Sequence, residues 1–182
     1  MQGLHIVDPE IATGEAARLF AATHKALGVI PNLAKVMANN LAVLEGYLDA
    51  VGALGPERTT LSPDLIERIA LLVAQENRSD YCLSVHSFRG TKVVGLTVLE
   101  TARARRGEAG DPRGAAVLAL ASAVVRERGA VSDDQLAMAR HDGLSDGQIV
   151  EVVAHVALNV FTNYLAKVAC VDIDWPLVRH TD

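Results

Sequence analysis

Cysteine, aromatic residues and long apolar runs are all scarce in this sequence of 182 residues. The two cysteines, Cys82 and Cys170, are too few for a disulfide framework and do not have a zinc-binding spacing. Aromatic residues make up only 4% of the chain, and the many alanine and leucine residues favour packed helices over strands. No alternating apolar pattern persists long enough to predict a strand. The sequence therefore predicts an all-α protein without structural disulfides.

Positive charge and membrane-type segments are lacking as well. The 17 basic residues are outnumbered by 22 acidic residues, and the net charge of −5 argues against a nucleic-acid partner. No uninterrupted apolar run approaches the roughly 20 residues of a membrane span, and residues 1–5 show no signal-peptide pattern. Phosphate-binding glycine loops and nucleophile elbows are absent too. We expect a cytoplasmic protein with no metal, no cofactor, and no nucleic-acid or membrane partner.

Helix start and stop signals divide the chain into a series of helices. The clearest start signals are the capping boxes at Thr97, Ser132 and Ser145, and the pairs Ser62-Pro63 and Asp111-Pro112. The expected helices cover 13–27, 32–38, 41–54 and 63–77, begin near residues 79, 97 and 132, and cover 112–129 and 146–169. No linker or repeat separates them, so we expect one domain, 1–182, of seven to nine helices. A mean hydropathy of +0.22 favours a homo-oligomer.

The segment from Ser79 to His86 contains the residues best suited to chemistry. Cys82 is expected in the first turn of a helix, where unpaired N–H groups and the positive end of the dipole stabilise a thiolate. His86 follows four residues later on the same helix face and can serve the thiol as a base or a cation. Tyr81 and Ser79 add hydroxyl groups. We therefore predict a lowered pKa at Cys82, although a buried cysteine that is only a small apolar residue also fits this spacing.

Glu67 is a second candidate, on the preceding helix. Its neighbours on the same helical face are Ala70, Leu71 and Ala74, which do not form a solvated stripe. A carboxyl in such surroundings is partly buried and has a raised pKa, which suits proton transfer. The alternative is a glutamate in the first helical turn that is exposed to water and favoured by the helix dipole.

A polar ridge on the last long helix forms the third candidate group. His155, Asn159 and Asn163 recur at steps of four among valine and leucine residues. Because buried polar groups need hydrogen-bond partners, this ridge must meet a ligand, a neighbouring helix or another subunit. We regard the three residues as candidate substrate-binding residues, with the structural alternative favoured.

Together, Glu67, Tyr81-Cys82 and His86 resemble the motif of the alkyl hydroperoxidase D-like (AhpD-like), carboxymuconolactone decarboxylase superfamily. Residues 29–34 are similar to the entry segment of that family and residues 156–164 to its late helix. The similarity extends from Asp8 to Pro176 and is closest to the peroxidase-related subgroup. It implies an all-α fold and a homo-oligomer: a dimer, a trimer, or a hexamer built from dimers.

The resemblance also implies roles for individual residues. Cys82 matches the cysteine that attacks the peroxide, while Glu67 and His86 match the groups that relay its proton, with Tyr81 placed to assist. Ser79 stands where the peroxidase branch has a resolving cysteine, and a serine hydroxyl cannot form the local disulfide. The expected activity is therefore reduction of a small hydroperoxide with an external thiol as reductant, unless Cys170 takes over the resolving step.

Two other functions remain open. The carboxymuconolactone decarboxylase branch acts on a lactone acid without a thiol pair, so Ser79 does not argue against it. An oligomeric ligand-binding protein that retains the fold without catalysis is the other alternative.

Overall fold

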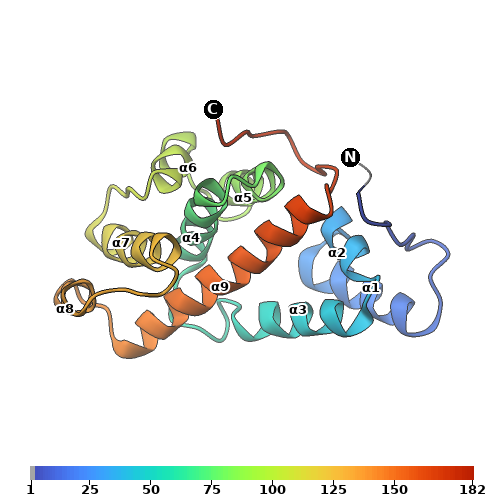
Figure 1. Ribbon diagram of the computed structural model, residues 1–182, viewed down its shortest axis with the longest axis horizontal. Coiled ribbons are helices and arrows are strands. Elements are labelled where there is room, and N and C mark those ends of the chain that lie inside the picture. Colours follow the sequence, from blue (N-terminus) through green and yellow to red (C-terminus); the bar gives the residue numbers. More distant parts are fainter. Residues whose placement is uncertain (1–2) are drawn as a thin grey trace.

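The computed structural model describes residues 3–182, and within that range it contains nine α-helices and no strand (Figure 1). The helices are α1 (Gly14–Leu27), α2 (Asn32–Met37), α3 (Leu41–Ala53), α4 (Pro63–Glu76), α5 (Asp80–Lys92), α6 (Val98–Arg105), α7 (Pro112–Arg126), α8 (Asp133–His141) and α9 (Asp146–Val168). The all-α prediction is confirmed, and each predicted helix matches an observed one to within a few residues.

The capping residues at the helix starts explain why the sequence predicted these starts correctly. Thr97, Ser132 and Ser145 each form both hydrogen bonds of a capping box, so the first turns of α6, α8 and α9 are satisfied by local side chains. Ser62 is the N-cap residue of α4, but its hydroxyl donates to Asp64 Oδ1 at 2.6 Å and accepts no backbone N–H of the first turn. The start of α4 therefore depends on its first residue, a proline, and on the acidic side chain beside it.

Helix α4 is the centre of the fold. It packs against α5, α6, α7 and α9, and nine of its residues, from Leu65 to Ala74, are buried. A helix that is apolar on nearly all sides must lie inside the protein. Figure 1 shows α9 crossing the molecule diagonally, with α1 to α3 on one side and α4 to α8 on the other.

A tight turn joins α4 to α5. The N–H of Arg78 donates to the carbonyl of Gln75 at 3.0 Å, and the N–H of Ser79 donates to that of Ala74 at 2.9 Å. With Arg78 at a φ of +53°, these bonds form a Schellman motif, which ends α4. Ser79 is both the last residue of this motif and the N-cap of α5. The turn therefore determines where the helix that carries Cys82 begins.

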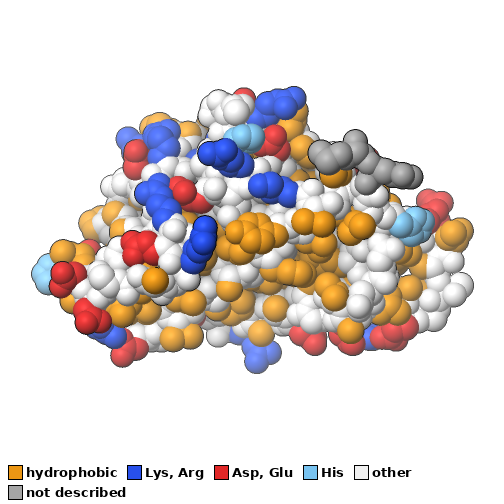
Figure 2. All heavy atoms as spheres, viewed as in Figure 1, with side chains coloured by type: hydrophobic (Ala, Val, Ile, Leu, Met, Phe, Trp, Pro, Cys, Tyr) orange, Lys and Arg blue, Asp and Glu red, His pale blue; other side chains and the backbone are white. Residues whose placement is uncertain are grey.

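Helix α9 is long and apolar enough, by length and composition alone, to cross a membrane. Its apolar residues do not form an uninterrupted run, because the polar ridge from His155 to Asn163 lies among them. Core helices of globular proteins meet the same criteria, and α9 packs as one, with contacts to α4, α5 and α7. Its outward face is apolar as well, and Figure 2 shows hydrophobic side chains gathered over this part of the surface.

The C-terminal segment, residues 171–182, folds back over the start of α5. The backbone N–H and the ring Nδ1 of His180 lie 2.8 Å and 2.7 Å from Asp80 Oδ1. The N–H of Val178 donates to Ser84 Oγ at 3.0 Å. The C-terminal segment is therefore fastened to the first two turns of α5, the helix that carries Cys82.

Candidate active site

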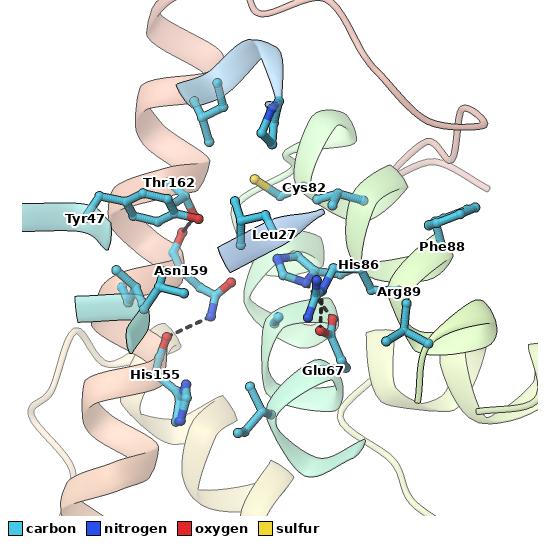
Figure 3. A pocket seen from close by; sticks show the side chains of 18 of the residues that line it. Leu27, Tyr47, Glu67, Cys82, His86, Phe88, Arg89, His155, Asn159 and Thr162 are labelled. Carbon is cyan, nitrogen blue, oxygen red and sulfur yellow. Dashed lines mark hydrogen bonds and ion pairs between the residues drawn. The ribbon is translucent and has the colours of Figure 1, made fainter. Parts of the chain in front are cut away.

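A cavity of about 280 Å³ is lined by residues of α1 to α5 and α9, with Trp175 from the C-terminal segment (Figure 3). Most of its lining is apolar, including leucine, valine, proline and alanine side chains. The side chains on its wall that carry polar groups or sulfur are Tyr47, Glu67, Tyr81, Cys82, His86, Arg89, His155, Asn159, Thr162 and Trp175. The cavity thus brings together six of the eight predicted site residues, from three separate helices.

The other two predicted site residues, Ser79 and Asn163, do not line the cavity. Ser79 is 1% exposed, and its side chain accepts the N–H of Cys82 at 3.5 Å as the N-cap of α5. Its place in the structure is therefore that of a helix cap, which positions the start of α5 without facing the cavity.

Cys82 lies in the first turn of α5, as predicted, and only 1% of its surface is exposed. Burial raises the pKa of the Cys82 thiol to about 11, although hydrogen bonds with the side chains of Ser79 and Thr162 oppose the rise. The predicted lowering of this pKa is therefore wrong, because the loss of water around the sulfur outweighs the favourable helix terminus.

Glu67 is buried, with 4% of its surface exposed, and each of its oxygens has a partner. His86 Nδ1 lies 2.8 Å from Glu67 Oε2, and Arg89 Nε donates to Glu67 Oε1 at 2.7 Å. Burial by itself raises the pKa of Glu67, but the charges and hydrogen bonds of His86 and Arg89 together lower it below its ordinary value. The predicted burial is confirmed and the predicted raised pKa is wrong, because His86 and then Arg89 offset the effect of burial.

The contact between Glu67 and His86 determines which nitrogen of the imidazole can accept a proton. Because Glu67 is ionised, it holds a proton on Nδ1 of His86, which leaves Nε2 as the nitrogen that can accept a proton. In Figure 3 the imidazole of His86 lies between Cys82 and Glu67. The thiol, the imidazole and the carboxylate therefore lie on one cavity wall, and among them the imidazole and the carboxylate are in hydrogen-bond contact.

Four side chains with polar groups on the cavity wall were not predicted from the sequence as site residues: Tyr47, Arg89, Thr162 and Trp175. Arg89 lies three residues after His86 and seven after Cys82, so the helical face shared with those residues was a usable signal. Tyr47 comes from α3, and no sequence signal places α3 beside the cavity. Burial and the neighbouring Cys82 raise the pKa of Tyr47 to about 12.

The hydroxyl of Tyr81 is used for structural contacts. It donates to Asp174 Oδ2 at 2.8 Å and accepts from the N–H of Leu33 at 3.2 Å. The ring packs edge-on against Trp175, with 5.8 Å between the ring centroids. Tyr81 thus ties α5 to α2 and to the C-terminal segment, and no hydrogen bond joins its hydroxyl to the thiol or the imidazole among the described residues.

The polar ridge of α9 is divided between cavity and core. His155 and Asn159 line the cavity, and Asn159 Nδ2 donates to the carbonyl of His155 at 2.9 Å. Asn163 is fully buried but does not line the cavity, and its amide donates to the carbonyl of Asn159. The prediction that Asn163 binds substrate is therefore not supported, because α9 turns this residue toward the helix packing.

Cys170 lies apart from this network. Both cysteines are free thiols, but Cys82 is buried and Cys170 is exposed.

Among residues 3–182, no group of three or more His, Cys, Asp or Glu side chains is arranged to hold a metal ion.

No protein-family model matches the sequence, and no curated protein matches it significantly. Solved structures do match. A peroxidase-related protein from Ralstonia eutropha, described as an alkylhydroperoxidase AhpD core, has a TM-score of 0.82 at 16% identity, covering 96% of this chain and 93% of its own. A peroxidase-related protein from Silicibacter sp. has a TM-score of 0.79 at 21% identity, covering 94% and 91%.

A third match is a cysteine-to-alanine variant of the debrominase Bmp8 in complex with 2,3,4-tribromopyrrole. Its TM-score is 0.77 at 16% identity, and the match covers 94% of this chain and 91% of that one. Each of the three similarities extends over nearly the whole of this helical chain. The protein therefore has the AhpD-like fold.

Proposed function

We propose that the protein is a thiol-dependent hydroperoxide reductase in which Cys82 is the only reacting cysteine. The observation that carries this proposal is the placement of a buried thiol on the wall of a largely apolar cavity, beside His86 held by ionised Glu67. A cavity of this kind suits a small organic hydroperoxide, whose carbon group is apolar and whose reactive oxygens are not.

The first half of the reaction consumes the peroxide. Nε2 of His86 takes the proton of the Cys82 thiol, and the sulfur then bonds to the outer oxygen of the peroxide. The O–O bond breaks, and the departing alkoxide takes the proton from His86 and leaves as an alcohol. Cys82 is oxidised to a sulfenic acid, and the peroxide is reduced by the same two electrons.

The second half requires an external thiol. Ser79 cannot resolve the sulfenic acid, so one thiol molecule condenses with Cys82 to give a mixed disulfide and water. A second thiol molecule attacks that disulfide, which releases the oxidised reductant and restores the Cys82 thiol.

Trapping of the sulfenic acid tests this proposal. A Cys170→Ser protein is treated with one equivalent of cumene hydroperoxide and then with dimedone, and the adduct is located by mass spectrometry. We expect an adduct at Cys82, slower formation of that adduct in Glu67→Gln, and none in Cys82→Ser. Consumption of peroxide at the same rate by Cys82→Ser would contradict the proposal.

Reductive dehalogenation of a small aromatic ring is a second candidate function. The observations that favour it are the apolar cavity with one thiol and the similarity in fold to a debrominase. In this reaction the sulfur bonds to the halogen, the carbon–halogen bond breaks, and the ring carbon takes a proton. External thiols then displace the halide and reduce Cys82. Release of bromide from a bromopyrrole, lost in Cys82→Ser, distinguishes this activity from peroxide reduction.

The geometry gives less support to a lactone-acid decarboxylase. Arg89 is the only lysine or arginine among the described residues on the cavity wall, and its Nε already pairs with Glu67. The charge of Arg89 is therefore already balanced by a carboxylate, which weakens the attraction of this wall for an anionic substrate. A non-catalytic ligand-binding role predicts that neither hydroperoxides nor haloaromatics react with Cys82.

A further inference from the structure

One polar atom on the cavity wall has no role in the proposed chemistry. His155 is 3% exposed and lines the cavity, but its Nε2 has no hydrogen-bond partner among the described residues. A buried polar atom without a partner is costly and rare in folded proteins. Burial also lowers the pKa of His155, so its imidazole is neutral near pH 7 and offers one donor or acceptor without charge.

Asn159 extends this polar patch along α9. Its amide nitrogen donates to the carbonyl of His155 at 2.9 Å, which fixes the orientation of the side chain. Figure 3 shows the amide of Asn159 within the cavity, above His155 in that view. The two residues therefore present adjoining polar groups in a lining that is otherwise mostly apolar.

The patch is separate from the thiol. Cys82 interacts with Thr162 of α9, and His155 lies seven residues earlier on the same helix. Seven residues correspond to two turns, or about 10 Å along the helix axis. Figure 3 accordingly shows Cys82 and His155 toward opposite ends of the cavity.

We propose that His155 and Asn159 form a subsite for a neutral hydrogen-bonding group, such as a phenolic hydroxyl or a ring N–H, at the end of the substrate remote from Cys82. The inference rests on the proposed function in that it takes the cavity as the substrate site. Such a subsite favours the binding of small, mostly apolar molecules that carry a second polar group, and it disfavours purely alkyl hydroperoxides and carboxylates.

Two ligands of the same shape test the subsite without any reaction at Cys82. p-Cresol and p-xylene differ by a hydroxyl in place of a methyl group, and their affinities are measured by calorimetric titration. We expect the wild-type protein to bind p-cresol roughly three- to tenfold more tightly, the range expected for one hydrogen bond. His155→Phe should lose this preference and still bind p-xylene, while His141→Phe, at an exposed site on α8, should retain it.

The ring resonances of His155, followed by NMR, provide a readout that a purely structural role would not move. They should shift on addition of p-cresol more than on addition of p-xylene. An unchanged preference for p-cresol in a folded His155→Phe protein would overturn the inference, and so would equal affinities in the wild type. Because neither ligand reacts with Cys82, these results stand apart from the success or failure of the peroxidase assay.

Discussion

Glu67 joins two side chains of α5 to the buried centre of the fold. Its two oxygens accept from His86 and Arg89 at 2.8 Å and 2.7 Å, so each oxygen has its own partner. These contacts explain how a carboxylate that is almost completely buried stays ionised. They also hold the imidazole of His86 in place on the cavity wall that Cys82 shares, which is the arrangement that the proposed proton transfer uses.

The raised pKa of Cys82 predicts slow alkylation at neutral pH. With a pKa of about 11, roughly one thiol in ten thousand is ionised at pH 7. In a Cys170→Ser protein, the rate of reaction with iodoacetamide should therefore keep rising with pH beyond the ordinary thiol range, with the denatured protein as control. A midpoint near the ordinary thiol value would contradict the raised pKa, because it would show that burial does not destabilise the thiolate.

The lowered pKa of Glu67 predicts a loss of stability in acid. A group whose pKa is lower in the folded state stabilises the fold above its unfolded pKa of about 4.5, and this contribution disappears as the pH falls through the folded value. Glu67→Gln should lower the free energy of unfolding near pH 7 by about 1–3 kcal/mol. The free energy of unfolding of this variant should also fall less steeply as the pH is lowered. Urea unfolding of both proteins between about pH 6 and about pH 3 measures the difference.

At the scale of elements, the turn between α4 and α5 places the candidate nucleophile. The Schellman bonds end α4, and Ser79 begins α5 one residue after Arg78, so Cys82 falls at the third position of the new helix. The same geometry brings residue 79 close to residue 82, because its side chain contacts the N–H of Cys82. A cysteine at position 79 would therefore lie near the range of Cα separations that a disulfide requires.

Ser79→Cys should supply the missing resolving thiol. We expect a disulfide between the introduced thiol and Cys82 after one equivalent of peroxide, and faster turnover with a dithiol reductant. Loss of the serine cap should lower stability by about 1 kcal/mol. Ser79→Ala is the matched control, since it removes the cap without adding a thiol. Peptide mapping under non-reducing conditions detects the disulfide, and its absence in an oxidised Ser79→Cys protein would contradict the expected geometry.

At the scale of the whole molecule, the outer face of α9 is an exposed apolar stripe. The exposed residues that form it are Val150, Val153, Ala157, Phe161, Tyr164 and Val168. They recur at intervals of three and four, so they share one side of the helix. A stripe of this kind is typical of a surface that packs against another helix.

We propose that this stripe mediates the homo-oligomer expected from the sequence. Phe161→Glu should shift the protein toward monomers, because it places a charge in the middle of the stripe. Light scattering coupled to size-exclusion chromatography measures the change, with Val98→Glu, at an exposed position on α6, as the control. A wild-type protein that is monomeric at all concentrations would rule out the proposal.

Local interactions explain what the sequence by itself determined. Helix limits depend on caps and on apolar periodicity, and both are visible within a few residues of each helix end. The spacing of Cys82 and His86 on one helical face is local in the same sense. The burial of Glu67 was visible in the apolar residues that share its face.

Tertiary packing decided the rest. The direction of the pKa shifts at Cys82 and Glu67 depends on which side chains and how much water surround them, and these come from separate helices. The same holds for Tyr47, which α3 brings to the cavity, and for Asn163, which the rotation of α9 keeps out of it. The lack of a partner for His155 Nε2 among the described residues can be recognised only from the tertiary structure, because it depends on every neighbour of that atom.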